Sequence, residues 1–187
     1  MLQKLLELDR YVFLFLNNMG SEKYDPLWLF ITKQINWIPF FLLLFYLIWK
    51  KIGTKQTLYV LFFVALLIAF TDQLTNVFKN TFGRIRPSSN PNLGSTMRKI
   101  LIRNSFSFFS GHASNTMAVA TFLFLTMKRH FKYFGLVFLW PLVFAYSRIY
   151  LGLHYPSDIM FGYLCGALTG FLFYKLYRKA QKKYFAE

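Results

Sequence analysis

The sequence predicts an all-α protein, a polytopic membrane helix bundle, and three observations lead to this prediction. Of its 187 residues, 56% are hydrophobic and only 16% are charged, and the charges lie between long apolar runs. A soluble domain is about 45–50% apolar and about 25% charged. The apolar content excludes a disordered chain, because it is sufficient to form a core. Cys165 is the single cysteine, so a disulfide scaffold is excluded as well.

Five stretches are long and apolar enough to cross a membrane, which requires roughly 20 mostly apolar residues. The first stretch, residues 26–49, is interrupted by Lys33 and Pro39, and the second, residues 57–78, is polar only toward its end. A sixth span would need residues 9–33 to fold across the membrane, and this alternative stays open. We expect one membrane-embedded domain covering residues 1–187, with spans at 26–49, 57–78, 110–127, 131–151 and 157–175.

The N-terminal 25 residues are expected to form an interfacial segment. The apolar run YVFLFL is too short to cross a membrane, and Glu7 and Asp9 precede it, which argues against a cleaved signal peptide. An interfacial helix over residues 1–20 would bury its apolar side in the lipid. The residues expected on that side are Leu2, Leu5, Leu6, Val12, Phe13 and Leu16.

The net charge of +15 predicts the orientation, because short cytoplasmic loops carry the excess of lysine and arginine. Seven such residues lie on the side of the 80–109 loop, which is therefore expected outside. The other side is expected to be cytoplasmic and includes a basic tail at 176–187, so nucleic acid is not needed to explain the charge. Its eleven basic residues are Lys50, Lys51, Lys55, Lys128, Arg129, Lys132, Lys175, Arg178, Lys179, Lys182 and Lys183.

Three polar clusters fall at span ends that share the outer face: residues 79–87, 110–112 and 147–158. Lys79, Arg86 and Arg148 have few carboxylates nearby to neutralise them, so an anion is expected to complete the site. Guanidinium groups bind tetrahedral oxyanions in a bidentate manner, which favours phosphate. Ser110 and Gly111 precede a helix whose free N–H groups would also bind an anion.

Two of the three histidines, His112 and His154, lie in the same clusters. Histidine supplies acid–base or nucleophilic chemistry near neutral pH. Asp158 follows His154 by four residues and could orient its ring, as a carboxylate does in hydrolase triads. Two histidines and one carboxylate among several cations make a poor divalent-cation site, so no metal is expected. The residues therefore predict metal-independent phosphoryl transfer.

These clusters resemble the three motifs of the type 2 phosphatidic acid phosphatase family, which shares its site plan with vanadium haloperoxidases and glucose-6-phosphatase. The first motif, Lys-x6-Arg-Pro, matches residues 79–87, and the third, Ser-Arg-x5-His-x3-Asp, matches residues 147–158. The second, Pro-Ser-Gly-His, matches residues 109–112 except that Phe109 stands in place of proline. Phe109 changes the backbone that enters the loop but removes no functional group.

The resemblance implies a role for each matching residue. His154 would be the nucleophile that forms a phosphohistidine, and Asp158 would hold its imidazole in the productive tautomer. His112 would protonate the leaving oxygen and then activate water. The phosphoryl oxygens would be bound by Lys79, Arg86, Arg148, the Ser110 hydroxyl and the Gly111 N–H.

The implied function is hydrolysis of lipid phosphate or diphosphate esters by an integral membrane phosphatase that uses no cofactor. Candidate substrates are undecaprenyl diphosphate, phosphatidylglycerophosphate, phosphatidic acid and lipid A phosphates. A lipid phosphotransferase that uses the same phosphohistidine, and a non-enzymatic lipid-phosphate binding or transport protein, remain as alternatives. We expect a bacterial inner membrane location with the site on the periplasmic side; the sequence leaves the oligomeric state open.

Several polar residues near these motifs have two interpretations. Arg84 would contact either the site or lipid headgroups, while Arg98, Lys99 and Arg103 would be either solvated or in contact with an anionic lipid. Asp72 is an intramembrane carboxylate, and pairing with a polar residue on a neighbouring span is favoured over pairing with a site cation. Close helix approach, within one chain or between two, is predicted by the four-residue spacing of Gly162, Gly166 and Gly170.

Overall fold

The computed structural model describes residues 1–184, except the side chains of Leu2 and Tyr184. These residues form helices and loops and no strand, so the predicted all-α class is confirmed. The α-helices are α1 (Leu2–Asn18), α2 (Asp25–Ile31), α3 (Ile38–Phe82), α4 (Gly111–Met127), α5 (Leu139–Tyr150) and α6 (Pro156–Tyr184). Short 3-10 helices are η1 (Glu22–Tyr24), η2 (Gln34–Trp37), η3 (Pro87–Ser89), η4 (Pro91–Leu93) and η5 (Phe134–Phe138).

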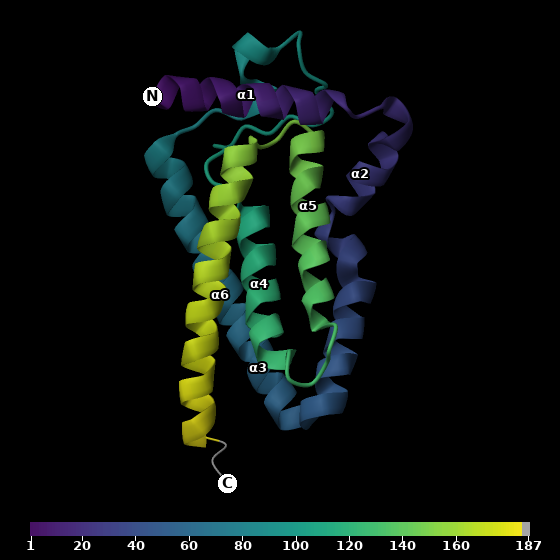
Figure 1. Ribbon diagram of the computed structural model, residues 1–187, viewed down its shortest axis with the longest axis vertical. Coiled ribbons are helices and arrows are strands. Elements are labelled where there is room, and N and C mark those ends of the chain that lie inside the picture. Colours follow the sequence, from purple (N-terminus) through teal and green to yellow (C-terminus); the bar gives the residue numbers. More distant parts are fainter. Residues whose placement is uncertain (185–187) are drawn as a thin grey trace.

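Helices α3 to α6 form an elongated bundle, and α1 lies across one end of it (Figure 1). Helix α4 packs against α3, α5 and α6, and the main apolar core surrounds it. Two helical stretches, Gln34–Leu93 and Pro156–Lys183, are long and apolar enough to cross a membrane, and the apolar stretch Phe134–Tyr150 is shorter. The α1 end of the bundle also receives the loop between α3 and α4 and the α5–α6 connection.

Helix α3 is two helices joined by a kink at Gly53, where φ is 74° and ψ is 173°. Glycine adopts a positive φ readily because it has no Cβ. Figure 1 shows α3 turning back on itself at the end of the bundle opposite α1. The segment before the kink and the segment after it therefore run in opposite directions, as expected for consecutive spans.

The stretch 26–49 differs from the single span that the sequence predicted. Helix α2 ends at Ile31, Lys33 has an extended backbone, and α3 begins only at Ile38. Pro39 lies in the first turn of α3, where its missing N–H would have no partner in any case. At the other end, α6 continues as a helix through residue 184, so most of the predicted basic tail is helical; residues 185–187 lie outside the described residues.

Glycines bring α6 close to α4 within this one chain. A Cβ on Gly162 would lie 2.7 Å from the carbonyl oxygen of Ser110, and Cβ atoms on Gly166 and Gly170 would lie even closer to the carbonyl oxygens of Ser114 and Ala118. The predicted close approach is therefore intramolecular. It brings the start of α6 beside the start of α4, where the Ser110 N–H donates to the Asp158 carbonyl at 3.0 Å.

Helix α1 turns a stripe of residues spaced by four toward the bundle. Phe13 is fully buried and packs edge-on against Tyr155, with ring centroids 5.5 Å apart. Asn17 is buried too, and its side-chain amide donates to the carbonyl of Tyr150 at 2.9 Å. The prediction that Phe13 faces lipid is therefore wrong, because an aromatic partner in the α5–α6 connection covers it. The predicted orientation of Leu2 lies outside the described side chains.

The other side of α1 is apolar and open. Leu5 and Leu6 are exposed and Val12 is partly covered. Leu16, contrary to the prediction, is not on this side, because it packs against the buried cluster that contains Phe13. An apolar face with no protein against it is the feature of a helix that lies in a membrane surface.

Candidate active site

Helix ends and loops bring the three motifs together beneath α1. Helix α3 ends at Phe82 and is capped by Gly83, which has a φ of 55° and whose N–H donates to the Lys79 carbonyl at 3.0 Å. This left-handed cap is a common helix ending, and it turns the following chain away from the helix axis. Arg84 thereby reaches Asp158 in the first turn of α6, and Arg86 reaches His154 in the segment between α5 and α6.

His154 is 1% exposed, and its two ring nitrogens have different neighbours. Nε2 lies 2.9 Å from Nη1 of Arg86. Because a guanidinium donates hydrogen bonds and accepts none, Nε2 must be the acceptor. A neutral ring then carries its proton on Nδ1, which lies 3.5 Å from Oδ2 of Asp158. This contact is longer than a normal N–H···O hydrogen bond, but it gives Nδ1–H a carboxylate to face and places the ring lone pair on Nε2, where Arg86 donates to it.

Asp158 is fully buried at the start of α6 and is fixed by several donors. Its Oδ2 accepts from the Tyr155 N–H at 2.9 Å and from the Ser107 hydroxyl. Its Oδ1 accepts from Nη1 of Arg84 at 2.6 Å. A carboxylate at a helix N-terminus is also stabilised by the helix dipole. The carboxylate that faces His154 is therefore held in one place.

The pKa of His154 is lowered to about 3, mainly by burial and also by the nearby charges of Arg86 and Arg148, while Asp158 acts in the opposite direction. Transfer of a group away from water disfavours its charged form. The imidazole is therefore neutral at pH 7, which is the form that a nucleophile needs.

Two buried arginines lie beside this histidine. Arg86 is anchored by the carbonyl of Ser105 at 2.7 Å and by that of Leu153 at 2.9 Å. Arg148 is 2% exposed and donates to the Thr32 hydroxyl, but its Nε has no partner among the described residues. A buried donor without a partner costs about 1–3 kcal/mol, more for a charged group. An anion bound here would remove that cost.

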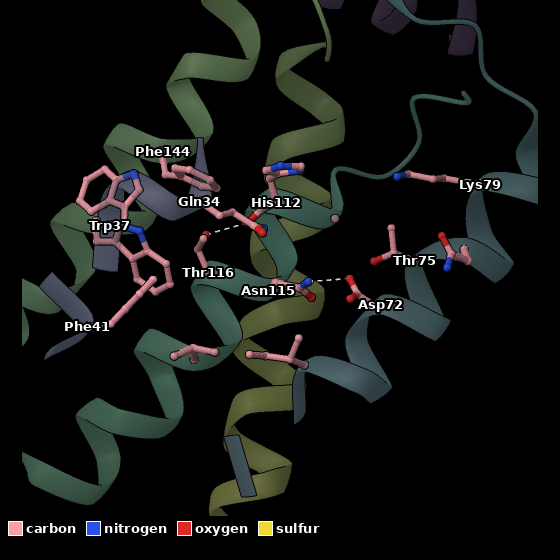
Figure 2. Close-up of a pocket in the computed structure, with 15 residues that line it drawn as sticks. Gln34, Trp37, Phe41, Asp72, Thr75, Lys79, His112, Asn115, Thr116 and Phe144 are labelled. Carbon is pink, nitrogen blue, oxygen red and sulfur yellow. Dashed lines mark hydrogen bonds between the residues drawn. The ribbon is translucent and has the colours of Figure 1, made fainter. Parts of the chain in front are cut away.

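A cavity of about 360 Å³ lies next to this cluster, between α3, α4 and α5. Of the predicted site residues, Lys79, Gly111 and His112 line it. Figure 2 shows Lys79 pointing toward the side of the cavity that holds His112. The His112 ring stacks on Phe144, with centroids 5.4 Å apart. Ser110 is buried at the N-cap of α4, where its hydroxyl accepts from the Ala113 N–H.

The predicted residues thus form two adjoining groups. Arg86, His154 and Asp158 are in direct contact and buried, whereas Lys79, Gly111 and His112 face the cavity. The groups are close enough for His112 to interact electrostatically with Arg148, His154 and Lys79. Within residues 1–184, no three His, Cys, Asp or Glu side chains lie close enough together to hold a metal ion.

Other basic residues of this region are paired or exposed. Arg84 donates to Asp9 and to Asp158, so it is part of the site framework and the headgroup interpretation is wrong. Arg98 pairs with Asp25 at 2.7 Å, a partner that neither of its sequence interpretations included. Lys99 and Arg103 are exposed.

Asp72 pairs with a polar residue on a neighbouring helix, as the sequence favoured. The side-chain amide of Asn115, in α4, donates to its Oδ1 at 2.6 Å (Figure 2). The Asn115 oxygen in turn accepts from the Thr71 hydroxyl. This pair lines the cavity one helical turn below His112.

Residues 56–182, which include all three motifs, match the family model of the PAP2 superfamily. The chain belongs to this superfamily. The resemblance to type 2 phosphatidic acid phosphatases is therefore confirmed, and with it the prediction that the chain is an integral membrane lipid phosphate hydrolase.

Two bacterial relatives of this PAP2 protein match nearly its whole length, and both are named lipid A 4'-phosphatase. The protein of Bacteroides thetaiotaomicron is 34% identical over 183 residues, which are 96% of this chain and 81% of the relative. The protein of Porphyromonas gingivalis is 30% identical over 187 residues, which are 98% of this chain and 78% of the relative.

Two crystal structures have the same fold as this PAP2 protein. The transmembrane PAP2-type phosphatidylglycerolphosphate phosphatase of Bacillus subtilis gives a TM-score of 0.72 at 20% identity, covering 94% of this chain and 87% of the other. LpxE of Aquifex aeolicus gives a TM-score of 0.70 at 23% identity, covering 90% and 95%. At these identities the comparison shows the fold alone.

Proposed function

We propose that the chain hydrolyses lipid phosphate monoesters through a phosphohistidine on His154. The observation that carries this proposal is the pair of contacts on the His154 ring, Arg86 at Nε2 and Asp158 at Nδ1. Together they favour a neutral imidazole whose lone pair is on Nε2, the nitrogen turned away from the carboxylate. That is the tautomer that can attack phosphorus while a carboxylate offsets the charge that develops on the ring.

In the first step, Nε2 of His154 forms a bond to phosphorus, and the bond between phosphorus and the lipid oxygen breaks. His112 donates a proton to that leaving oxygen. In the second step, His112 takes a proton from water, whose oxygen attacks phosphorus and breaks the P–N bond. Inorganic phosphate leaves, and His154 returns to its neutral form.

The cations of both groups bind the phosphoryl oxygens. Arg86 exchanges its contact with Nε2 for a phosphoryl oxygen, and the unpartnered Nε of Arg148 gains an acceptor. Lys79 approaches from the cavity, together with the Gly111 N–H and the Ser110 hydroxyl. Preorganised donors of this kind stabilise the charge of the phosphoryl group in the transition state, so no metal ion is required.

A lipid A phosphate is the first candidate substrate, because the two relatives that match nearly the whole chain carry that name. The cavity suits an amphiphile. Polar side chains line it near His112, among them Asp72 and Asn115, and apolar ones line it elsewhere, among them Ile68 and Val119. A phosphorylated headgroup would occupy the polar part and an acyl chain the apolar part.

We also propose a topology of five spans within one domain of residues 1–187. The spans are the two segments of α3 together with α4, α5 and α6. Helix α1 lies at the membrane–water interface on the periplasmic side of the same membrane. The open apolar face of α1 and its position across the bundle support this arrangement (Figure 1). The distribution of basic residues supports a site on the periplasmic side of a bacterial inner membrane.

Release of phosphate by the purified protein tests the proposed reaction. Lipid A, phosphatidylglycerophosphate, phosphatidic acid and undecaprenyl diphosphate would be supplied in detergent with EDTA. We expect inorganic phosphate from lipid A at the highest kcat/KM, unaffected by the chelator and inhibited by vanadate. Loss of activity with EDTA would contradict the metal-free mechanism. A phosphorylated acceptor lipid in place of inorganic phosphate would identify a transferase instead.

A further inference from the structure

The carboxylate of Asp9, in α1, is held against the first turn of α6. Its Oδ1 accepts from the Ser157 N–H at 2.9 Å, and its Oδ2 accepts from the Ser157 hydroxyl at 2.5 Å. Nη2 of Arg84 donates to the same Oδ2 at 2.6 Å. The Asp9 side chain is only 9% exposed. These contacts join residues 148 and 75 positions apart and hold a charged group of the N-terminal helix beside Asp158 and Arg84.

Arg84 is shared between two carboxylates. While Nη2 donates to Asp9, Nη1 donates to Oδ1 of Asp158 at 2.6 Å and to the Ser157 hydroxyl at 2.7 Å. The guanidinium also lies over the Tyr155 ring, 4.1 Å from its centroid. One cation therefore lies between two anions, and the three side chains together carry one negative charge.

This balance matters because the other charged groups around His154 are cationic. Besides burial, which is the main cause, Arg86 after α3 and Arg148 in α5 lower the pKa of His154, whereas Asp158 raises it. Lys79 in α3 and the exposed Arg103 add positive charge to the same region, and both interact electrostatically with the neighbouring His112. Arg10, next to Asp9 in α1, is a further cation of this region and interacts electrostatically with Tyr155. Without Asp9, the charge of Arg84 would cancel that of Asp158, and no net negative charge would face His154.

We propose that Asp9 is a positioning residue for the phosphatase reaction: it is the counterion of Arg84, and it thereby leaves the charge of Asp158 to act on His154. The proposal rests on the proposed role of His154 as the nucleophile. Bond formation between Nε2 and phosphorus places positive charge on the imidazole, and the free charge of Asp158 offsets it. Asp9 touches neither the substrate nor His154, and it acts through Arg84 and Asp158.

The test compares charge states of this cluster in the full-length protein. Asp9→Asn leaves Arg84 and Asp158 as a neutral pair, whereas the double variant Asp9→Asn/Arg84→Met restores one net negative charge on Asp158. The matched control is Asp25→Asn, which breaks the Arg98–Asp25 pair; Asp25 also accepts from the Tyr150 hydroxyl, and neither contact includes His154, Asp158 or Arg84. For each variant, kcat and KM for phosphate release and the rate of phosphoenzyme formation are measured, with thermal unfolding as the check on folding.

We expect Asp9→Asn to lower kcat and the rate of phosphoenzyme formation about tenfold with KM nearly unchanged, since a unit charge is altered near the reacting ring. The double variant is expected to recover to within about threefold of the wild type, and Asp25→Asn to keep the wild-type kcat. A purely structural role for Asp9 predicts the opposite order, because each further substitution would add to the loss.

Wild-type kcat in Asp9→Asn, or a folded double variant slower than Asp9→Asn, would overturn the proposal. If Asp9→Asn does not fold, the double variant and Asp9→Glu are used for the test instead. A double variant that folds but is inactive overturns the proposal, and activity in both variants supports the proposal. His154→Ala is measured in parallel. If that variant releases phosphate as the wild type does, the nucleophile assignment fails, which is a different result from failure of Asp9 alone.

Discussion

Nη1 of Arg86 lies 2.9 Å from Nε2 of His154, so the arginine of the first motif determines which nitrogen of the third-motif histidine carries the proton. The same arginine is tied to the carbonyls of Ser105 and Leu153, which limits its movement. The contact couples the proposed phosphate-binding arginine directly to the proposed nucleophile.

Replacement of Arg86 by methionine is expected to lower kcat/KM about 100-fold or more, because one preorganised donor to the phosphoryl group and the restraint on His154 are lost together. Arg103→Met is the matched control. Arg103 is also basic and close to the site, but its side chain is exposed, and we expect its kcat/KM to stay within about threefold of the wild type. Equal losses in the two variants would show that only the general positive charge matters.

His112→Asn should separate the two chemical steps. With a lipid phosphate, loss of the general acid lowers kcat by about 10²–10⁴-fold. With p-nitrophenyl phosphate, whose leaving group needs no proton, we expect a burst of nitrophenol followed by slow turnover, because the phosphoenzyme still awaits an activated water. His130→Asn, at an exposed position outside the motifs, is the control. A variant without a burst and with proportional losses on both substrates would contradict the assigned role.

Stability is expected to fall on acidification because of His154. Its pKa is about 3 in the folded protein and about 6.5 in an unfolded chain, so the unfolded state binds more protons between these values. The free energy of unfolding therefore decreases as the pH falls from about 6.5 toward 3, by up to about 1.4 kcal/mol per pH unit. Thermal unfolding in detergent at pH 7 and pH 4.5 measures the effect. His154→Gln should show a smaller decrease, and an equal decrease would refute the pKa shift.

The close contact between α4 and α6 predicts a large effect of side chains at Gly166. A Cβ there would meet the Ser114 carbonyl oxygen and would lie 3.1 Å from the Met117 Cβ. Overpacking of this kind costs typically about 1–3 kcal/mol, so Gly166→Val is expected to lower the thermal unfolding midpoint by several degrees. Gly135→Ala is the control, because its nearest neighbour would be 3.8 Å away. Similar midpoints for the two variants would contradict this packing.

Motif spacing predicted that the three polar clusters would lie together, but not the contacts that hold them in place. The three clusters meet at one end of the bundle because helices that alternate in direction place every second connection on the same side. The pairing of Asp72 with Asn115 also followed from the cost of an isolated charge among apolar helices.

The links from α1 could not be read from the sequence, because periodicity shows which residues share a helix face and not what they meet. Phe13 has the periodicity of a lipid-facing residue, yet Tyr155 covers it. Asp9 is separated from Ser157 by 148 positions, and no local pattern joins them. The sequence did contain one signal for the Asp9–Arg84 pair, which is charge. Asp9 is one of only seven acidic residues, and Arg84 lies within the basic first motif, residues 79–87.

The most direct test of the central claim is the identification of the phosphorylated residue. Purified protein would be mixed with a ³²P-labelled lipid phosphate and quenched within milliseconds, and the labelled peptide would then be mapped. We predict an acid-labile, alkali-stable label on His154 that is absent in His154→Ala. A label on any other residue, or phosphate release by His154→Ala at the wild-type rate, would contradict the mechanism.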